Sequence, residues 1–219
     1  MINYSTDLNK DLKAFLIERE LLSSLRKDAT SRKIPIIDDE IGYFLSMACL
    51  LVKPKSILEI GCGSGYSTYF LIRNLPDGSS YNGIDLNKDR LAIAQEFIKS
   101  SFPEKSSGKI QYYAGNALKI IPDLNQKFDM VFIDAAKYEY PQYIKSLLEK
   151  LEINALVIAD NIFYDGKIFK KNTSKHDTNS IRGIKEYIDF ITSSSYFQSH
   201  FLDIGDGIAV SFYLGLLEY

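Results

Sequence analysis

Several features that mark whole classes of protein are scarce in this sequence. Its 219 residues include two cysteines and two histidines, and the formal net charge is -2. Cys49 and Cys62 lie in apolar or glycine-rich surroundings without metal-ligand spacing, so we expect two free thiols rather than a disulfide. The near balance of charge excludes a broad nucleic-acid footprint but leaves room for a local basic patch.

The sequence also lacks the long apolar run of a membrane protein. No run approaches the roughly 20 residues that span a bilayer. The polar segment from Met1 to Lys10 is unlike a signal peptide, so we expect a cytoplasmic protein without a membrane partner. With 46% hydrophobic and 25% charged residues, the chain has an ordinary globular composition. Its length predicts a single domain over residues 1–219.

Strand-like and helix-like segments alternate along most of the chain. Two helix-like segments come first and predict an N-terminal helical cap over residues 1–52. The core, residues 53–219, alternates short strand-like runs with helix-like stretches, which predicts an α/β fold. The sheet would be mainly parallel with helices on both faces, and the carboxyl ends of its strands would share one edge, where ligands bind. The helix-like segments are 8–27, 41–52, 66–74, 88–99, 117–121 and 140–151, and the strand-like runs are 56–60, 80–85, 109–114, 128–134 and 155–160.

The C-terminal part follows a different pattern. An amphipathic segment, 181–191, precedes two strand-like runs, 200–204 and 208–214, which are joined by Gly205-Asp206-Gly207. This tight turn predicts an antiparallel hairpin at the end of the sheet. The polar, lysine-rich stretch 167–179 is expected to be an exposed loop.

A glycine-rich loop, from Glu59 to Ser67, joins the first strand to the next helix. Dinucleotide-binding loops usually have the spacing G-x-G-x-x-G. Here the spacing is G-x-G-x-G, and Glu59 disfavours a pyrophosphate but suits a ligand with an amino group and a sulfonium. The alternatives are thus a dinucleotide and S-adenosylmethionine. Asp85, about twenty residues further on, is placed to bind ribose hydroxyls, which both of these cofactors carry. The loop alone fits an ordinary strand–helix turn; together with Asp85 and the hairpin it favours S-adenosylmethionine.

Acidic residues follow two further strands. Asp134 follows the fourth strand, and Asp160 and Asn161 follow the fifth, so the three should converge at one edge of the sheet. Two neighbouring carboxylates repel unless one is protonated or a cation lies between them. Oxygen ligands suit a hard ion such as Mg²⁺, and the absence of sulfur and imidazole argues against zinc. The alternative is that each aspartate caps the helix that follows it.

Lys137 stands three residues after Asp134. Next to a bound dication its pKa would fall, and the lysine would then serve as a base. A solvated surface lysine is the alternative.

Four motifs resemble those of the cation-dependent O-methyltransferases, the group of the catechol and caffeoyl-CoA enzymes. They are LEIGCGSGYST, FDMVFIDAAKYEY, VIADNIFYDG and IGDGIAVS, and the resemblance extends from residue 34 to 212. It implies a Rossmann-like, seven-stranded sheet with an antiparallel C-terminal strand. It also implies S-adenosylmethionine and a divalent cation, Mg²⁺, Mn²⁺ or Ca²⁺, as cofactors. The N-terminal helices would cover the substrate or form a homodimer.

The same resemblance implies a role for individual residues. Two vicinal oxygens of the acceptor would chelate the metal, Lys137 would take a proton, and the oxyanion would attack the sulfonium methyl in line. The family usually has aspartate where this chain has Asn116, whose carbonyl oxygen still suits the adenine amino group. The implied cofactor-binding residues are Ile37, Glu59, Gly61, Gly63, Gly65, Tyr66, Ser67, Asp85, Leu86, Gly115, Asn116, Ala117 and Asp134; the metal ligands are Asp134, Asp160 and Asn161, and the catalytic residues are Lys137 and Asp134.

Four functions remain open from the sequence. The first is methylation of a small catechol-like or phenolic acceptor, with Tyr138, Tyr140, Phe163 and Tyr164 as an aromatic wall or as ordinary core. The second is methylation of a hydroxyuridine in tRNA, for which a basic loop would contact phosphates. A non-catalytic protein that binds the cofactor would not need Lys137 and the carboxylates, and a nicotinamide oxidoreductase conflicts with the glycine spacing. The basic loop consists of Lys167, Lys170, Lys171, Lys175 and His176.

Overall fold

The computed structural model describes residues 4–105, 109–170, 174–175 and 177–215, with side chains from residue 18 onward. They form two compact units, residues 1–36 and 37–219. The first contains one long helix, α1 (Tyr4–Ser31). Among the described helices, none has the length and apolar character required to cross a membrane.

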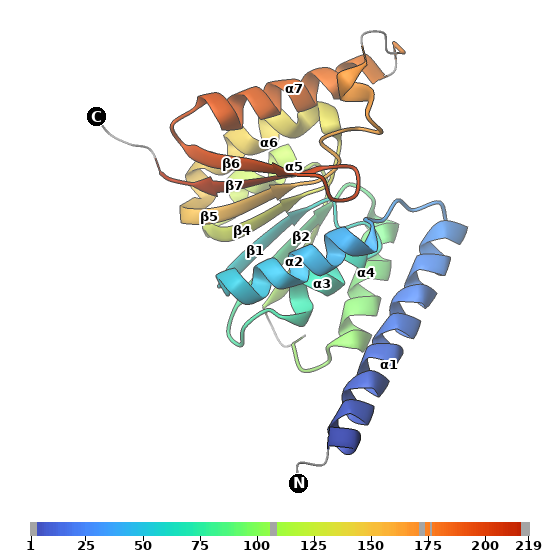
Figure 1. Cartoon of the computed structure of the whole chain (residues 1–219). Coiled ribbons are helices and arrows are strands. Elements are labelled where there is room, and N and C mark those ends of the chain that lie inside the picture. Colours follow the sequence, from blue (N-terminus) through green and yellow to red (C-terminus); the bar gives the residue numbers. More distant parts are fainter. Residues whose placement is uncertain (1–3, 106–108, 171–173, 176, 216–219) are drawn as a thin grey trace. The chain divides into compact units, whose positions relative to one another are not determined.

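A seven-stranded sheet forms the centre of the second unit (Figure 1). Its strand order is β3-β2-β1-β4-β5-β7-β6. The first five strands along the chain are parallel, and β7 is antiparallel to both β5 and β6. The expected α/β fold with an antiparallel C-terminal strand is therefore confirmed. The strands are β1 (Ser56–Ile60), β2 (Ser80–Asp85), β3 (Ile110–Ala114), β4 (Phe128–Ile133), β5 (Leu151–Ala159), β6 (Phe197–Leu202) and β7 (Ile208–Tyr213).

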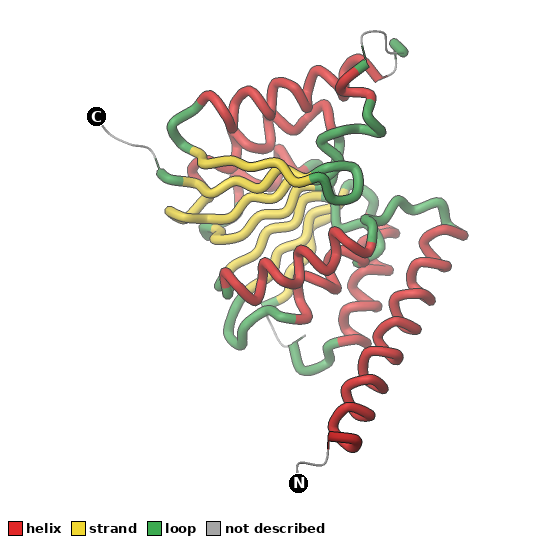
Figure 2. Tube along the Cα trace, viewed as in Figure 1, coloured by secondary structure: helices red, strands yellow, loops and turns green. Residues whose placement is uncertain are grey.

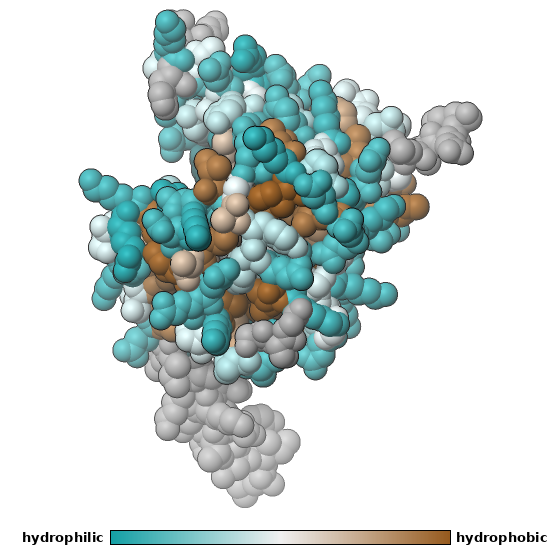
Figure 3. All heavy atoms as spheres, turned by 180° about the vertical axis from the view of Figure 1, so that it is seen from behind, coloured by the Kyte–Doolittle hydropathy of each residue, from teal (hydrophilic) through white to brown (hydrophobic). Residues whose placement is uncertain are grey.

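Helices cover both faces of this sheet (Figure 2). The carboxyl-terminal parts of the central strands β1, β4 and β5 are buried from both sides, which explains why their sequences are mainly apolar, with Glu59 as a buried exception. On the face of the molecule in Figure 3, hydrophilic side chains predominate and hydrophobic ones lie in separate groups between them. The helices of the second unit are α2 (Asp39–Val52), α3 (Tyr66–Arg73), α4 (Lys88–Ser101), α5 (Ala117–Ile120), α6 (Tyr140–Leu147) and α7 (Asp177–Ser193), with short 3₁₀ turns η1 (Ile121–Asp123), η2 (Lys137–Glu139), η3 (Leu148–Lys150) and η4 (Lys167–Phe169).

Several element boundaries differ from the sequence expectation; β6, for example, spans Phe197–Leu202 rather than 200–204. β5 begins at Leu151, because this residue still pairs with Phe128 across an irregularity in the register. α7 begins at Asp177, because the Ser174 hydroxyl accepts from the Asp177 N–H at 3.1 Å and caps the helix. The expected loop 167–179 is therefore shorter at its C-terminal end, and residues 171–173 and 176 lie outside the described part.

Close packing of α2 on α3 generates a prediction for stability. A Cβ at Gly42 would lie 2.4 Å to 2.7 Å from three atoms of the buried Phe70 ring. Although alanine favours helix over glycine by about 1 kcal/mol, we expect Gly42→Ala to lower the free energy of unfolding by about 1–3 kcal/mol. Urea denaturation would measure it, with Ser100→Ala at an exposed position of α4 as control. A gain in stability for Gly42→Ala would contradict this packing.

Candidate functional site

The carboxyl ends of β1, β2, β4 and β5 bring the predicted site residues to one edge of the sheet. The Asp134 N–H donates to Ile60 O at 2.9 Å, and the Asp160 N–H donates to Ile133 O at 2.9 Å. These bonds continue the sheet pairing by one residue, so Asp134 lies between the glycine loop after β1 and Asp160 after β5. The structure therefore places Asp134 and Asp160, two of the three residues expected to converge, at the ends of neighbouring strands.

The glycine loop lies directly against Asp134. At Gly61 φ is +96°, and a Cβ there would lie 1.9 Å from the backbone oxygen of Asp134. A side chain at this position is excluded both by the left-handed backbone and by the close approach. The loop is also tied to β2, because the Gly63 N–H donates to Asp85 Oδ2 at 2.8 Å. The Asn87 N–H donates to Asp85 Oδ1 at 2.8 Å, so both oxygens of Asp85 are held by backbone groups.

Glu59 is fully buried beneath this loop. Its carboxylate accepts hydrogen bonds from the hydroxyls of Ser67, Thr68 and Tyr81, the Thr68 bond being 2.6 Å long. Burial raises the pKa of Glu59 to about 7, although the three hydrogen bonds favour the charged form. Glu59 and Ser67, both expected to bind the cofactor, are therefore hydrogen-bonded to each other. Thr68 and Tyr81 were not predicted; their only sequence signal is a polar group in an otherwise buried helix or strand.

The remaining residues expected to bind the cofactor lie in this loop, ahead of α2, and after the carboxyl ends of β2 and β3. Asn116 caps α5, because its Oδ1 accepts from the Leu118 N–H at 2.8 Å, and one lone pair of that oxygen remains for another donor. The Gly115 N–H donates to Asp85 O at 2.9 Å, so Gly115 adjoins Asp85. The others are Ile37, buried ahead of α2; Tyr66, buried with its hydroxyl on Asp39; Ala117, buried in α5; Gly65 at the start of α3; and Leu86, which is 77% exposed. Their contacts with a cofactor stay predictions.

Asp160 is almost completely buried but only half satisfied. Its Oδ1 accepts from the Asn161 N–H at 2.6 Å, whereas Oδ2 is buried without a hydrogen-bond partner. Burial, and next the negative charge of Asp134, raise the pKa of Asp160 well above its usual range. An unpaired carboxylate oxygen in the interior is costly unless a cation or a proton satisfies it.

Lys137 lies in the first turn after Asp134, in η2. Its Nζ is 2.8 Å from Asp134 Oδ1 and 2.8 Å from the Tyr140 hydroxyl, and its side chain is 12% exposed. The Tyr140 hydroxyl in turn is 3.0 Å from Asp160 O and 3.2 Å from Ile133 O. Lys137 is therefore a fixed, half-buried ammonium group rather than a solvated one. Tyr140 was expected only as a possible wall of an aromatic pocket, and the structure shows that it holds Lys137.

The donor set fits a hard divalent cation. In the described part of the chain, no three His, Cys, Asp or Glu side chains gather as a metal-binding group. The ligands expected from the sequence are two carboxylates, of Asp134 and Asp160, and the side-chain amide of Asn161. Such an oxygen set with open positions for water or a substrate is what Mg²⁺ requires. The unpaired oxygen of Asp160 is the observation that supports a cation here.

Comparison with known proteins defines the class. Residues 12–213 match the model of the O-methyltransferase family. The sequence is 33% identical to a catechol O-methyltransferase of Niastella koreensis over 138 residues, 61% of this chain and 61% of that protein. It is 25% identical to the caffeoyl-CoA O-methyltransferase of Stellaria longipes over 208 residues, 90% of this chain and 85% of that one. The fold is similar to that of the Streptomyces achromogenes O-methyltransferase TomG in complex with SAM, with a TM-score of 0.80, 23% identity and 90% coverage of each chain.

The protein therefore belongs to the O-methyltransferase family. The match covers the glycine loop, the carboxylate cluster and the C-terminal hairpin together. The sequence-based assignment to this family is confirmed.

The burial of Glu59 generates a prediction for the pH dependence of stability. The pKa of Glu59 is raised from 4.5 to about 7, so the folded protein binds this proton more tightly than the unfolded chain. The protonated side chain therefore contributes stability that is fully present below pH 4.5 and is lost as the pH rises through 7. Glu59→Gln removes this titration. We expect the free energy of unfolding of the variant, relative to that of the wild type, to rise by on the order of 2–3 kcal/mol from pH 4.5 to pH 8.5. Urea denaturation of the ligand-free proteins would measure the gain; a difference between the two proteins that is the same at both pH values would contradict it.

Proposed function

We propose that this chain transfers the methyl group of S-adenosylmethionine to a hydroxyl of a small catechol-like or phenolic acceptor, assisted by a divalent cation. The observation that carries the proposal is the buried, half-satisfied Asp160 beside Asp134, with Lys137 Nζ fixed 2.8 Å from Asp134 Oδ1. A catechol O-methyltransferase and caffeoyl-CoA O-methyltransferases are among its relatives.

The glycine-loop side of the site supports binding of the methyl donor. Structural neighbours were solved with SAM or SAH, TomG and a Bacillus cereus O-methyltransferase among them. In this chain Glu59 offers a buried carboxyl group whose charged form the cationic amino acid part of the donor would stabilise. Asp85, oriented by Gly63 and Asn87, is placed for the ribose hydroxyls. Charge and position thus favour adenosylmethionine over a dinucleotide.

The carboxylate side supports the acceptor chemistry. Asp134, Asp160 and Asn161 would hold the cation, with Mg²⁺, Mn²⁺ and Ca²⁺ all compatible with oxygen ligands. When bound, adenosylmethionine supplies the electrophilic methyl group and the cation lowers the pKa of an acceptor hydroxyl. A hydroxyl beside Asp134 would lie within reach of Lys137 Nζ, which in its neutral amine form, favoured next to a bound dication, would take the proton and become an ammonium group. Tyr140, by holding the lysine at 2.8 Å, fixes the direction of that transfer.

The alternative function on tRNA gains no support. Of its basic loop, Lys171 and His176 lie outside the described residues. Lys167 is engaged within the protein, 3.2 Å from Asp177 and 3.6 Å from Asp165. The relatives named above carry the names of enzymes for catechol and caffeoyl-CoA. A homodimer and a cytoplasmic location stay predictions from the sequence.

Methyl transfer with labelled adenosylmethionine tests the proposed function. Catechol, caffeoyl-CoA and bulk tRNA would be offered separately, each with Mg²⁺ and with EDTA. We expect label in at least one of the two phenolic acceptors, lost with EDTA because the carboxylates need the cation. Label in tRNA alone, or transfer that EDTA leaves unchanged, would contradict the proposal.

A pair of lysine variants, one inside and one outside the site, tests whether methyl transfer takes place at this site. Lys137→Met keeps the length of the side chain but removes the base, and we expect kcat to fall by about 10²–10⁴-fold. The affinity for adenosylmethionine, measured by calorimetry, should stay within about twofold. Lys145→Met on α6, outside the site, is the control for loss of one lysine. Equal activities of the two variants would exclude Lys137 as the base.

A further inference from the structure

The segment that follows β5, residues 161–169, here termed the Asn161 loop, has an unusual backbone. Asn161, Tyr164 and Asp165 have φ values of 54°, 50° and 53°, and Gly166 follows with 67°. Left-handed backbone at residues other than glycine costs on the order of 1 kcal/mol or more each and persists only when neighbouring groups hold it. This loop carries Asn161, so whatever holds the loop also determines where that amide lies.

One anchor comes from the hairpin between β6 and β7. The Asp165 N–H donates to the Asp206 carboxylate, at 2.9 Å and 2.8 Å from its two oxygens. The Phe163 N–H donates to Asp206 O at 2.9 Å, and the Ile162 N–H donates to Gly207 O at 3.0 Å. These bonds hold the backbone of the loop, but none of them involves the side chain of Tyr164 or Lys167.

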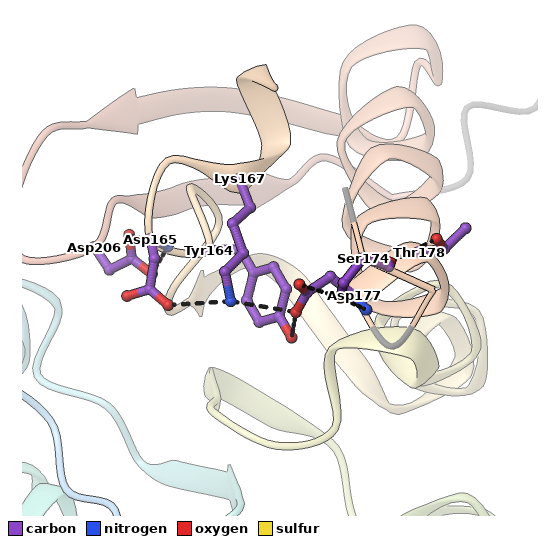
Figure 4. A network of polar contacts seen from close by, with 7 residues as sticks. All are labelled: Tyr164, Asp165, Lys167, Ser174, Asp177, Thr178 and Asp206. Carbon is purple, nitrogen blue, oxygen red and sulfur yellow. Dashed lines mark hydrogen bonds and ion pairs between the residues drawn. The ribbon is translucent and has the colours of Figure 1, made fainter. Parts of the chain in front are cut away.

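A second anchor comes from the first residue of α7 (Figure 4). Asp177 Oδ1 accepts from the Tyr164 hydroxyl at 3.1 Å and from Lys167 Nζ at 3.2 Å. Lys167 Nζ also lies 4.7 Å from the centre of the Tyr164 ring and 3.6 Å from Asp165 Oδ2. Tyr164, Lys167 and Asp177, here termed the Asp177 clamp, therefore bind one another in all three pairs.

Asp177 is itself fixed. Its other oxygen, Oδ2, accepts from the Ser174 hydroxyl at 2.6 Å, while its N–H donates back to that hydroxyl. Hydrogen bonds from Ser174, Lys167 and Tyr164 lower the pKa of Asp177 to about 2, so it stays charged at every pH at which the protein would be assayed. The same helix, α7, packs against η2, the turn that carries Lys137. Its Tyr187 lies edge-on to Tyr140 at 5.6 Å between ring centres. α7 thus contacts both the loop of the candidate amide ligand and the tyrosine that holds Lys137.

We propose that the Asp177 clamp positions the Asn161 loop, so that Asp177 and Lys167 determine the affinity for the divalent cation and for the acceptor without touching either. The inference rests on the proposed function for the identity of the ligands. It assigns Asp177 and Lys167 as positioning residues, which act through Tyr164 and the backbone of the loop. Support residues behind metal ligands typically contribute about 10–100-fold to metal affinity.

Two variants break the clamp from opposite sides. Asp177→Asn keeps one acceptor oxygen, which suits Tyr164, but replaces the oxygen that faces Ser174 with an N–H donor and removes the charge that holds Lys167. Lys167→Met removes the cation without altering α7. Asp189→Asn, at an exposed position of the same helix, is the control for loss of one carboxylate. Binding of adenosylmethionine to the glycine loop, which the clamp does not contact, reports whether each variant is folded.

The first measurement is hydrogen exchange of residues 161–169 in the full-length protein without metal. We expect exchange at least about tenfold faster in Asp177→Asn and Lys167→Met than in wild type and Asp189→Asn, because the strained loop opens more often. The second is Mn²⁺ binding followed by electron paramagnetic resonance, with an expected loss of at least about tenfold in both variants. In steady-state assays the acceptor KM should rise, whereas the affinity for adenosylmethionine should stay within about twofold.

The outcomes separate this inference from the proposed function. Exchange in Asp177→Asn and Lys167→Met equal to that in Asp189→Asn would overturn the clamp, whatever the protein binds. Faster exchange with unchanged Mn²⁺ affinity and unchanged acceptor KM would overturn its role in positioning. A wild-type protein that binds no Mn²⁺ would instead count against the cation in the proposed function, and the exchange measurement would still decide whether the clamp holds the loop.

Discussion

The buried carboxylate of Asp160 is the constraint on which the rest of the site depends. It lies at the end of β5, next to Asp134 at the end of β4, and one of its oxygens has no partner within the described protein. Two carboxylates in this arrangement repel each other, and burial makes the charged form still less favourable. A protein selected for stability alone would not place them so. The arrangement becomes favourable once a divalent cation is held between the carboxylates and the neighbouring amide.

The parallel sheet makes this arrangement possible. Consecutive parallel strands deliver their carboxyl ends to one edge, so residues far apart in sequence, Glu59, Asp85, Asp134 and Asp160, meet without long loops. The order of the strands places β1 and β4 side by side, which brings the glycine loop against Asp134. In the proposed function, the donor and acceptor subsites would therefore share Asp134. The C-terminal hairpin and α7 then hold the loop after β5, which the sheet itself does not constrain.

Much of this could be predicted from the sequence, for physical reasons that differ between elements. Strands such as 56–60 and 128–133 are largely buried on both faces and are therefore mainly apolar, and the residues that follow parallel strands must converge. Tyr81 and Thr68 could not be predicted as partners of Glu59, because nothing local indicates which buried hydroxyl points to which acid. The start of α7 was missed because Ser174 and Asp177 were included in a polar stretch, although their spacing is that of an N-terminal cap. In the Asn161 loop, Asn161, Asp165 and Gly166 are residue types that tolerate the left-handed region, whereas Tyr164 is held there by tertiary contacts and has no sequence signal.

The most direct test of this account is the thermal stability of wild type and Asp160→Asn, each with and without Mg²⁺. If the buried carboxylate is completed by a cation, Mg²⁺ should raise the Tm of the wild type, since a ligand at about 100 times its Kd stabilises by about 2.7 kcal/mol. Without cation, Asp160→Asn should be more stable than the wild type, because the repulsion with Asp134 is gone, and Mg²⁺ should leave its Tm unchanged. A cation-free variant that is less stable than the wild type, together with equal Mg²⁺ responses of the two proteins, would contradict the account.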